Sequence, residues 1–141
     1  MKIADIMTSN VEWCKPESKI YEAAEKMKEL DVGVMPICDS GSVVGVVTDR
    51  DVVIKGVANN IPVDAQVSQV MSTDPVTGNR NMLVEDAAEL MADHQIRRLP
   101  IVDDDKLVGI VSLGDLAVNQ NTDRKAGEAL EDISYPSEPE Q

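Results

Sequence analysis

Residues 45–51 read Gly-Val-Val-Thr-Asp-Arg-Asp, and residues 109–115 read Gly-Ile-Val-Ser-Leu-Gly-Asp. Each stretch begins with glycine, continues with apolar residues and reaches a hydroxyl residue, which an aspartate follows three positions later. A hydroxyl residue with an acidic residue three positions on is typical of the start of a helix, and a short apolar run before it is typical of a strand. The chain is therefore predicted to contain the same strand-to-helix junction twice.

The similarity extends well beyond these two junctions. Residues 3–54 align without a gap on residues 67–118, and identical residues are spread over the whole alignment. The identities pair Met7 with Met71, Ala23-Ala24-Glu25 with Ala87-Ala88-Glu89, Met27 with Met91, Pro36-Ile37 with Pro100-Ile101, and Asp39 with Asp103. A unit of about 50 residues buries too little surface to be stable alone, so the two copies are expected to pack into a shared core.

Each repeat is predicted to form the element order β-α-β-β-α. A helix is expected where apolar residues recur at helical spacing, from Ile20 to Leu30 and from Val84 to Met91, with Ser18 as the N-cap of the first. After each helix, turn residues separate two apolar runs, which predicts a hairpin. The predicted strands are 11–14, 34–38 and 43–48 in the first repeat and 76–77, 99–102 and 107–112 in the second, and second helices begin at Asp49 and Gly114.

The predicted fold class is mixed α/β (α+β), with two tandem repeats in a chain of 141 residues. The hydrophobic content of 43% suits a globular protein. Repeat one is assigned to residues 1–56, a linker to 57–66, repeat two to 67–120, and an acidic C-terminal tail to 121–141, with a helix expected at 124–133.

Charge and composition argue against several classes of function. The net charge of −13 repels nucleic-acid backbones and anionic membrane surfaces. No apolar run reaches the roughly 18 residues that span a bilayer, and Asp5 stands where a signal peptide would become apolar, which indicates a cytoplasmic protein. Two cysteines and one histidine are too few for a disulfide scaffold or a multi-histidine metal site, so no metal or required cofactor is expected.

Together with Met35-Pro36-Ile37 and Leu99-Pro100-Ile101, the two junctions resemble those of the CBS domain. This domain is the repeated module of cystathionine β-synthase, IMP dehydrogenase and the γ subunit of AMP-activated protein kinase. The resemblance covers residues 1–118 and implies that the repeats form a compact pseudo-twofold pair, a Bateman-type module with two related clefts. In many members of the family, a cleft binds AMP, ADP, ATP or S-adenosylmethionine.

The chemistry of the junction suits such a ligand. Free backbone N–H groups and a hydroxyl meet where Thr48 or Ser112 ends its strand. The carboxylate of Asp51 or Asp115, three residues later, can accept two hydrogen bonds from the 2′,3′-diol of a ribose. The same geometry also serves the fold alone, with the hydroxyl as a helix cap and the aspartate opposite the helix dipole. The motif by itself leaves both interpretations open.

Arginines beside the motifs favour an anionic ligand. In family members that bind AMP, a basic residue directly before the Leu-Pro strand lies at the phosphate edge, and Arg98 has that position here, next to Arg97. The first repeat has Val34 there, so the two clefts are not equivalent. In the alternative interpretation, the two arginines are solvated or pair with Asp103 or Asp104. Because bidentate arginine suits phosphate and the chain is otherwise strongly acidic, we favour the anion site.

By resemblance, each cleft combines the hydroxyl–aspartate motif of one repeat with the beginning and second strand of the other. One cleft is expected to use Ser112, Asp115 and Arg98 with Ser9, Asn10, Val11, Val32 and Gly33. The other is expected to use Thr48, Arg50 and Asp51 with Thr73, Asp74, Val76 and Ile96. The apolar members would hold the adenine face, and Gly33 either lets the base lie against the backbone or is only a loop glycine.

Few other residues suggest chemistry. Cys14 and Cys38 lie at strand ends in the first repeat only, and we expect two reduced, partly buried thiols, with a redox pair as the alternative. Trp13 and Tyr21 are expected to pack against the core or a partner. His94 is expected to lie buried, or at the rim, on the apolar face of its helix.

These observations predict a stand-alone, non-enzymatic regulatory protein that senses adenosine nucleotides. Its signal is expected to pass through a homodimer or an unidentified protein partner, by a shift in population between arrangements. The first alternative is a structural or interaction module with empty clefts, responsive to redox state through its two cysteines. An enzyme is disfavoured because no nucleophile–base pair or metal cluster is evident, and nucleic-acid binding is disfavoured by the charge.

Overall fold

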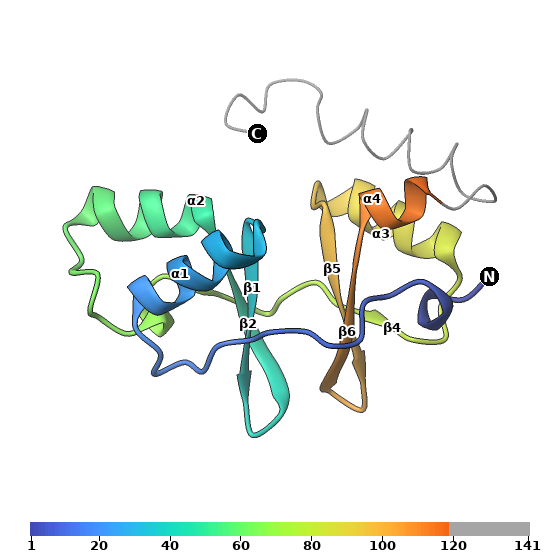
Figure 1. The fold of residues 1–141 in the computed structure, drawn as a ribbon, viewed down its shortest axis with the longest axis horizontal. Coiled ribbons are helices and arrows are strands. Elements are labelled where there is room, and N and C mark those ends of the chain that lie inside the picture. Colours follow the sequence, from blue (N-terminus) through green and yellow to red (C-terminus); the bar gives the residue numbers. More distant parts are fainter. Residues whose placement is uncertain (119–141) are drawn as a thin grey trace. The chain divides into compact units, whose positions relative to one another are not determined.

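The computed structural model describes residues 1–118, which form two compact units that we describe separately (Figure 1). The first-repeat unit consists of Glu12–Pro75 with Asp105–Leu107. Among the described residues, the second-repeat unit consists of Met1–Val11, Val76–Asp104 and residues 108–118. The expected acidic tail and the helix at 124–133 lie outside the described residues.

The first-repeat unit is a hairpin with helices beside it (Figure 1). The strand predicted at 11–14 does not form, and Cys14 makes only an isolated parallel bridge with Ile37. Antiparallel pairing of β1 with β2 runs from Val34 opposite Thr48 to Asp39 opposite Ser42. The helical segment after β2 is longer than its first element, because a wider π-type segment (Val52–Gly56) and a 3₁₀ turn (Val57–Asn59) continue it. The named elements are α1 (Ile20–Leu30), β1 (Val34–Asp39), β2 (Ser42–Thr48), α2 (Asp49–Asp51) and β3 (Ser72–Thr73).

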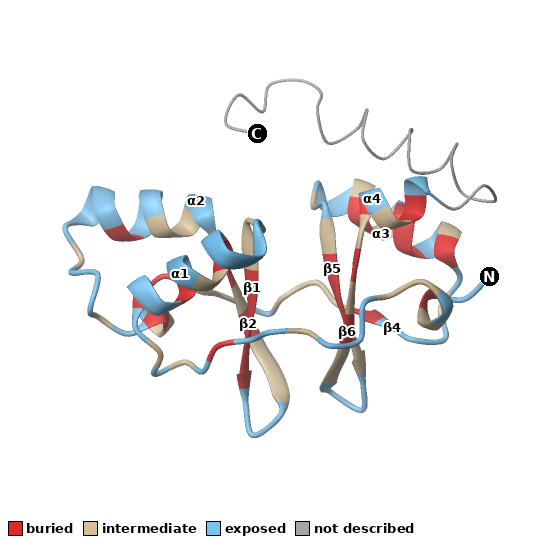
Figure 2. Cartoon of the chain, in the orientation of Figure 1, coloured by how far each residue is buried: buried red, intermediate tan, exposed pale blue. Residues whose placement is uncertain are grey.

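The core of this unit forms where one face of α1 meets one face of the hairpin. Ile20, Ala23 and Met27 of α1 are buried, as their helical spacing predicts. Ala24 and Leu30 are exposed, so the buried stripe of α1 is narrower than its set of apolar residues. The buried side chains of this core are those of Cys14, Ile20, Ala23, Met27, Met35, Ile37, Val47, Val67 and Val70. Figure 2 shows the buried residues along the middle of β1 and β2.

The second-repeat unit has the full predicted order around its own core, with its first strand at Gly78–Asn79 in place of the predicted 76–77. β5 and β6 are hydrogen-bonded neighbours, and β4 pairs with β5 in parallel, with Gly78 opposite Ile101. The elements are β4 (Gly78–Asn79), α3 (Val84–His94), β5 (Arg98–Asp103), β6 (Lys106–Ser112) and α4 (Leu113–Ala117). Its buried residues are Ile3, Val84, Ala87, Ala88, Met91, Leu99, Ile101, Val111, Leu113 and Leu116.

Each unit includes the beginning of the other repeat. Ile3 belongs to repeat one by sequence, yet its side chain is fully buried in the core that contains Val84 and Leu116. The Ile3 N–H donates to the carbonyl of Met82 at 3.0 Å, and Thr8 exchanges two hydrogen bonds of 2.9 Å with Ile110 on β6. The start of repeat two behaves in the same way in the first-repeat unit, where Val67 and Val70 are buried and β3 pairs with β2.

These exchanged segments explain the glycine that begins each motif. A Cβ at Gly45 would lie 2.6 Å from the carbonyl oxygen of Ser72 and 3.1 Å from the sulfur of Met71. A Cβ at Gly109 would lie 2.5 Å from the sulfur of Met7 and 3.0 Å from the carbonyl oxygen of Thr8. Only a residue without a side chain allows the exchanged segment to approach the strand this closely.

Several local predictions need correction. The helix α1 begins at Ile20 with Lys19 as its N-cap, because the hydroxyl of Ser18 is engaged by the N–H of Lys15 at 3.0 Å. The last helix begins one residue before the predicted Gly114, at Leu113. Part of the segment predicted as a linker, 57–66, is hydrogen-bonded to the start of α1, where the N–H of Ile20 donates to the carbonyl of Ala65 at 2.9 Å.

The prediction for the single histidine is also wrong. His94 is exposed, because it is the last residue of α3, and Gln95 then turns into the left-handed region at φ 55°. Trp13 and Tyr21 are each 40% exposed, so neither is a core residue of its unit.

Candidate functional site

The first of the two junctions closes on itself through a reciprocal pair of hydrogen bonds. The Thr48 N–H donates to Oδ2 of Asp51 at 3.0 Å, and the Asp51 N–H donates to Oγ1 of Thr48 at 3.0 Å. Both residues are half-buried. This is a capping box, which supplies partners for backbone N–H groups at the start of the helix.

The second junction has the same geometry. The Ser112 N–H donates to Oδ2 of Asp115 at 2.9 Å, and the Asp115 N–H donates to Oγ of Ser112 at 3.1 Å. Capping therefore uses the hydroxyl and one carboxylate oxygen in each motif, as the fold-based interpretation predicts. The other oxygen, Oδ1, is not needed for the cap, so a half-buried carboxylate keeps an acceptor for a further donor.

The two carboxylates differ in a contact with Lys55, which is not among the predicted site residues. Nζ of Lys55 lies 3.2 Å from Oδ1 of Asp51 and donates to Oγ of Ser72 at 3.2 Å. In the part of the chain that the structure describes, Asp115 has no ion pair of this kind. The sequence did contain a signal, since an aspartate and a lysine four residues apart face each other on a helix.

Arg97 and Arg98 lie beside the junction of the second-repeat unit. The carbonyl of Arg97 accepts a hydrogen bond from the N–H of Leu113 at 3.0 Å, which ties the start of β5 to the start of α4. Arg98 follows as the first residue of β5 and is half-buried, while Arg97 is exposed. Asp103, considered as a partner for these arginines, instead lies 3.9 Å from Arg80.

The remaining predicted site residues divide between the units. The second-repeat unit contains Ser9, Asn10, Val11, Val76, Ile96, Arg98, Ser112 and Asp115. The first-repeat unit contains Val32, Gly33, Thr48, Arg50, Asp51, Thr73 and Asp74. Ser9 and Asn10 are exposed and directly follow the pairing of Thr8 with Ile110, and Thr73 pairs with Gly45 on β2. In the described residues, no hydrogen bond joins Ser9, Asn10 or Thr73 to a capping box.

Gly33 contacts the junction of its own repeat. Its carbonyl accepts a hydrogen bond from the N–H of Asp49 at 2.9 Å, and a Cβ at this position would lie 3.1 Å from Oδ2 of Asp49. The open space that a glycine leaves is therefore taken up by the Asp49 carboxylate. This position corresponds to Arg97 in the second repeat, whose carbonyl makes the equivalent bond.

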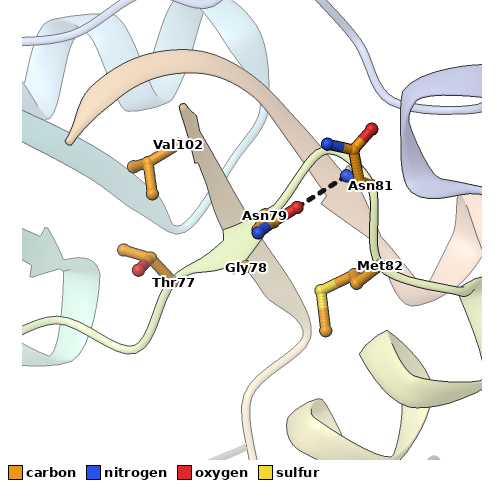
Figure 3. A pocket seen from close by; sticks show the side chains of 6 residues that line it. All are labelled: Thr77, Gly78, Asn79, Asn81, Met82 and Val102. Atoms are coloured by element: carbon orange, nitrogen blue, oxygen red, sulfur yellow. Dashed lines mark hydrogen bonds between the residues drawn. The ribbon is translucent and has the colours of Figure 1, made fainter. Parts of the chain in front are cut away.

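A pocket of about 440 Å³ lies in the second-repeat unit, at the beginning of its own repeat (Figure 3). Its lining residues are Thr77, Gly78, Asn79, Asn81, Met82 and Val102. The side chain of Asn79 accepts a hydrogen bond from the N–H of Asn81 at 2.7 Å, which fixes one wall. None of the predicted site residues lines this pocket. The first repeat has Trp13 in the position of Thr77, a much larger side chain.

Cys14 and Cys38 are free and buried. The N–H of Cys38 donates to the carbonyl of Cys14 at 2.8 Å, so the two residues are neighbours on adjacent segments. Burial raises the pKa of Cys38 to about 11 and also raises that of Cys14. A raised pKa leaves little thiolate at neutral pH, so the environment works against thiol chemistry in this unit.

Residues 1–118 contain no group of three or more His, Cys, Asp or Glu side chains placed to hold a metal ion. Over the same residues, no helix is long and apolar enough to cross a membrane.

Comparison with known proteins agrees with the repeat and with the fold. The family model of the CBS domain matches residues 3–56 and again residues 67–119. The CBS domain-containing protein YhcV of Bacillus subtilis (strain 168) is 50% identical over 133 residues, which cover 94% of this chain and 95% of that protein.

Two solved structures share the fold and contain adenosine derivatives. The crystal structure of CBSX2 in complex with AMP is 28% identical, covers 87% of this chain and 98% of that chain, and superposes with a TM-score of 0.75. The CBS domain pair of MJ0100, in complex with 5′-methylthioadenosine and S-adenosyl-L-methionine, is 27% identical, covers 84% and 94%, and has a TM-score of 0.74. The family expected from the two junction motifs is thereby confirmed: the chain belongs to the CBS domain family and carries two copies of the domain.

Proposed function

We propose that the chain is a non-enzymatic, cytoplasmic regulatory protein that binds an adenosine-containing ligand through its two hydroxyl–aspartate junctions. The expected ligands are AMP, ADP, ATP and S-adenosylmethionine. Binding shifts the population between arrangements of a homodimer or of a complex with a protein partner. Relatives with the same fold that contain AMP, or 5′-methylthioadenosine and S-adenosyl-L-methionine, support this class of ligand.

The observation that carries the proposal is the second oxygen of Asp115. The capping box fixes the carboxylate through Oδ2 and leaves Oδ1 as an acceptor on a half-buried side chain. A carboxylate is a suitable acceptor for a ribose diol, because a hydrogen bond to a charged group contributes more than one to a neutral group. The cap holds this carboxylate in one position. Arg98, at the start of the adjacent strand, would supply the cation for a phosphate.

The proposed ligand residues are those expected from the family. At the second junction they are Ser112, Asp115 and Arg98, with Ser9, Asn10, Val11, Val32 and Gly33. At the first they are Thr48, Arg50 and Asp51, with Thr73, Asp74, Val76 and Ile96. In the proposal, Arg98 makes the Ser112–Asp115 site the tighter of the two for a nucleotide.

Calorimetric titration tests the proposal with AMP, ADP, ATP and S-adenosylmethionine, and with GMP as the control for the base. We expect Asp115→Ala to weaken binding by about 1.5–3 kcal/mol, because it removes a charged acceptor from the ribose. We expect Arg98→Ala to lower the affinity for AMP and to flatten its salt dependence, because the lost attraction is Coulombic. Absence of binding by a folded parent chain, or equal affinity in parent and Asp115→Ala, would rule out the proposed site.

Exposed apolar residues of the first-repeat unit support the homodimer. Val53, Ile54 and Val57 lie on the helical segment after α2 and are 54%, 50% and 60% exposed. Three such side chains within one segment form a small apolar surface that a second copy can cover. Light scattering is expected to give twice the chain mass for the parent and the single mass for Ile54→Glu. Leu83→Glu, at an exposed apolar residue of the other unit, is the control. A monomeric parent at tens of micromolar would contradict the dimer.

A further inference from the structure

The two motif carboxylates differ in what holds their second oxygen. At Asp51, capping occupies Oδ2, and the ammonium of Lys55 lies 3.2 Å from Oδ1. The side chain of Lys55 is 46% exposed, and that of Asp51 is 13% exposed. The ammonium therefore covers the oxygen that capping leaves open.

A second contact fixes the position of the ammonium. Nζ of Lys55 also donates to Oγ of Ser72, at 3.2 Å, and Ser72 is held in the unit by the pairing of β3 with β2. Lys55 thus connects the helical segment after α2 to the segment that contains the proposed ligand residue Thr73. A lysine held by two partners is better placed to compete with a ligand than a lysine that is free in solvent.

The second repeat has no counterpart to this lysine. In the alignment of the repeats, the residue that corresponds to Lys55 is Asn119, an uncharged amide, and the residue that corresponds to Ser72 is Thr8. Thr8 is bound through its backbone to Ile110. The feature is therefore specific to the first repeat and is not required by the fold.

We propose that Lys55 is a specificity-determining residue that lowers the affinity of the Thr48–Asp51 site for a ribose, so that a nucleoside binds first at Ser112–Asp115. A ribose diol that donates to Asp51 has to displace the ammonium from Oδ1, whereas no cation of residues 1–118 pairs with Asp115. This inference rests on the proposed function. It adds that the unequal affinity has a cause at Asp51 itself, separate from the arginine at the other site.

The test uses adenosine, because a nucleoside without phosphate reports on the ribose contact and not on the attraction of a phosphate to lysine. Titrations are made in the Asp115→Ala chain, in which the remaining site is the one at Asp51. We expect Lys55→Met in this background to tighten adenosine binding by about three- to fivefold, the scale of a partly exposed ion pair. Added salt is expected to tighten binding in the Lys55 chain and to have no such effect in the Lys55→Met chain.

Two matched variants separate this effect from a general loss of charge. Lys55→Arg keeps a cation at the position and is expected to keep the low affinity. Lys26→Met removes a lysine of the same unit that pairs with Glu12 at 2.8 Å, and it is expected to leave adenosine binding unchanged. If Lys55→Met leaves adenosine binding unchanged or weakens it, while the parent chain binds adenosine normally at Ser112–Asp115, the role of Lys55 is overturned and the proposed function stands. Failure of the parent chain to bind any adenosine ligand would overturn the proposed function and this inference with it.

Discussion

At the scale of single residues, one side chain in each motif has two tasks. Asp51 and Asp115 each cap a helix through one oxygen. Lys55 covers the second oxygen of Asp51, whereas no cation among residues 1–118 pairs with the second oxygen of Asp115. The sequence predicts the aspartates, because their spacing from Thr48 and Ser112 is a local pattern. It does not distinguish capping from ligand binding, because both use the same spacing, and the contact of Lys55 with Ser72 joins residues that only the fold brings together.

The buried thiol of Cys38 leads to a prediction on pH dependence. Its pKa is raised from 9.0 to about 11 by burial, so the folded chain holds this proton more strongly than the unfolded chain does. The associated stability is fully present below pH 9.0 and is lost as the pH rises toward about 11. We expect Cys38→Val, which introduces the residue found in the second repeat at Val102, to reduce the fall in unfolding free energy over this range.

Urea denaturation of the parent and the variant at several pH values from 8 to 10 measures this difference. The rest of the sequence is common to both chains, so its contribution to the pH dependence cancels in the comparison. Parallel pH profiles of the parent and Cys38→Val would show that the thiol does not titrate as its burial implies.

At the scale of elements, the helices and the hairpin of each repeat were predictable because each is encoded locally, whereas the strand predicted at 11–14 is reduced to a single bridge between Cys14 and Ile37. The apolar residues at Ile20, Ala23 and Met27 have helical spacing, and turn residues separate each pair of strands. Sequence periodicity does not predict that β2 and β6 are crossed closely by exchanged segments. The contacting segments, Met7-Thr8 and Met71-Ser72, are too short to show a hydrophobic periodicity. The sequence also does not show which segment approaches Gly45 or Gly109.

The close approach of the exchanged segment to β6 predicts different changes in stability when Gly109 and Gly114 are replaced by alanine. Gly109→Ala is expected to destabilise the chain by about 1–3 kcal/mol, because its Cβ would lie 2.5 Å from the sulfur of Met7 and 3.0 Å from the carbonyl of Thr8. Gly114→Ala is the matched control within α4, where the nearest atom to a new Cβ is Oγ of Ser112 at 3.5 Å. Gly114→Ala is expected to be neutral or to stabilise by up to about 1 kcal/mol, since alanine favours the helix. Urea denaturation measures the unfolding free energies of the two variants. Equal values would contradict the close approach of Met7 and Thr8 to Gly109.

At the scale of the whole molecule, the repeats of the sequence are not the units of the structure. The first eleven residues belong by sequence to repeat one and by packing to the second-repeat unit, and residues 67–75 are exchanged in the opposite sense. The alignment of the repeats identifies equivalent positions correctly, but it carries no information on which copy receives each segment. The burial of Ile3 among Val84 and Leu116 reveals it.

The exchange predicts which unit is destabilised by a mutation in the 3₁₀ turn Ile3–Asp5. Ile3→Ala is expected to cost about 2–5 kcal/mol, because it removes a fully buried side chain. Hydrogen exchange followed by peptide mass spectrometry should show faster exchange in α3, β5 and β6, while α1, β1 and β2 keep their protection. Val70→Ala should give the converse pattern. Loss of protection in α1 and β1 on Ile3→Ala would mean that the first residues belong with their own repeat.

The exchange of opening segments also constrains how such a chain changes length in evolution. Each repeat gives its beginning to its companion and receives a beginning in return, as Ile3 and Val67 show. Deleting one whole repeat would remove the core in which the first residues of the other repeat are buried. It would also remove the exchanged segment that completes the other repeat's own core. The loss of a single repeat is therefore expected to destabilise what remains of the chain.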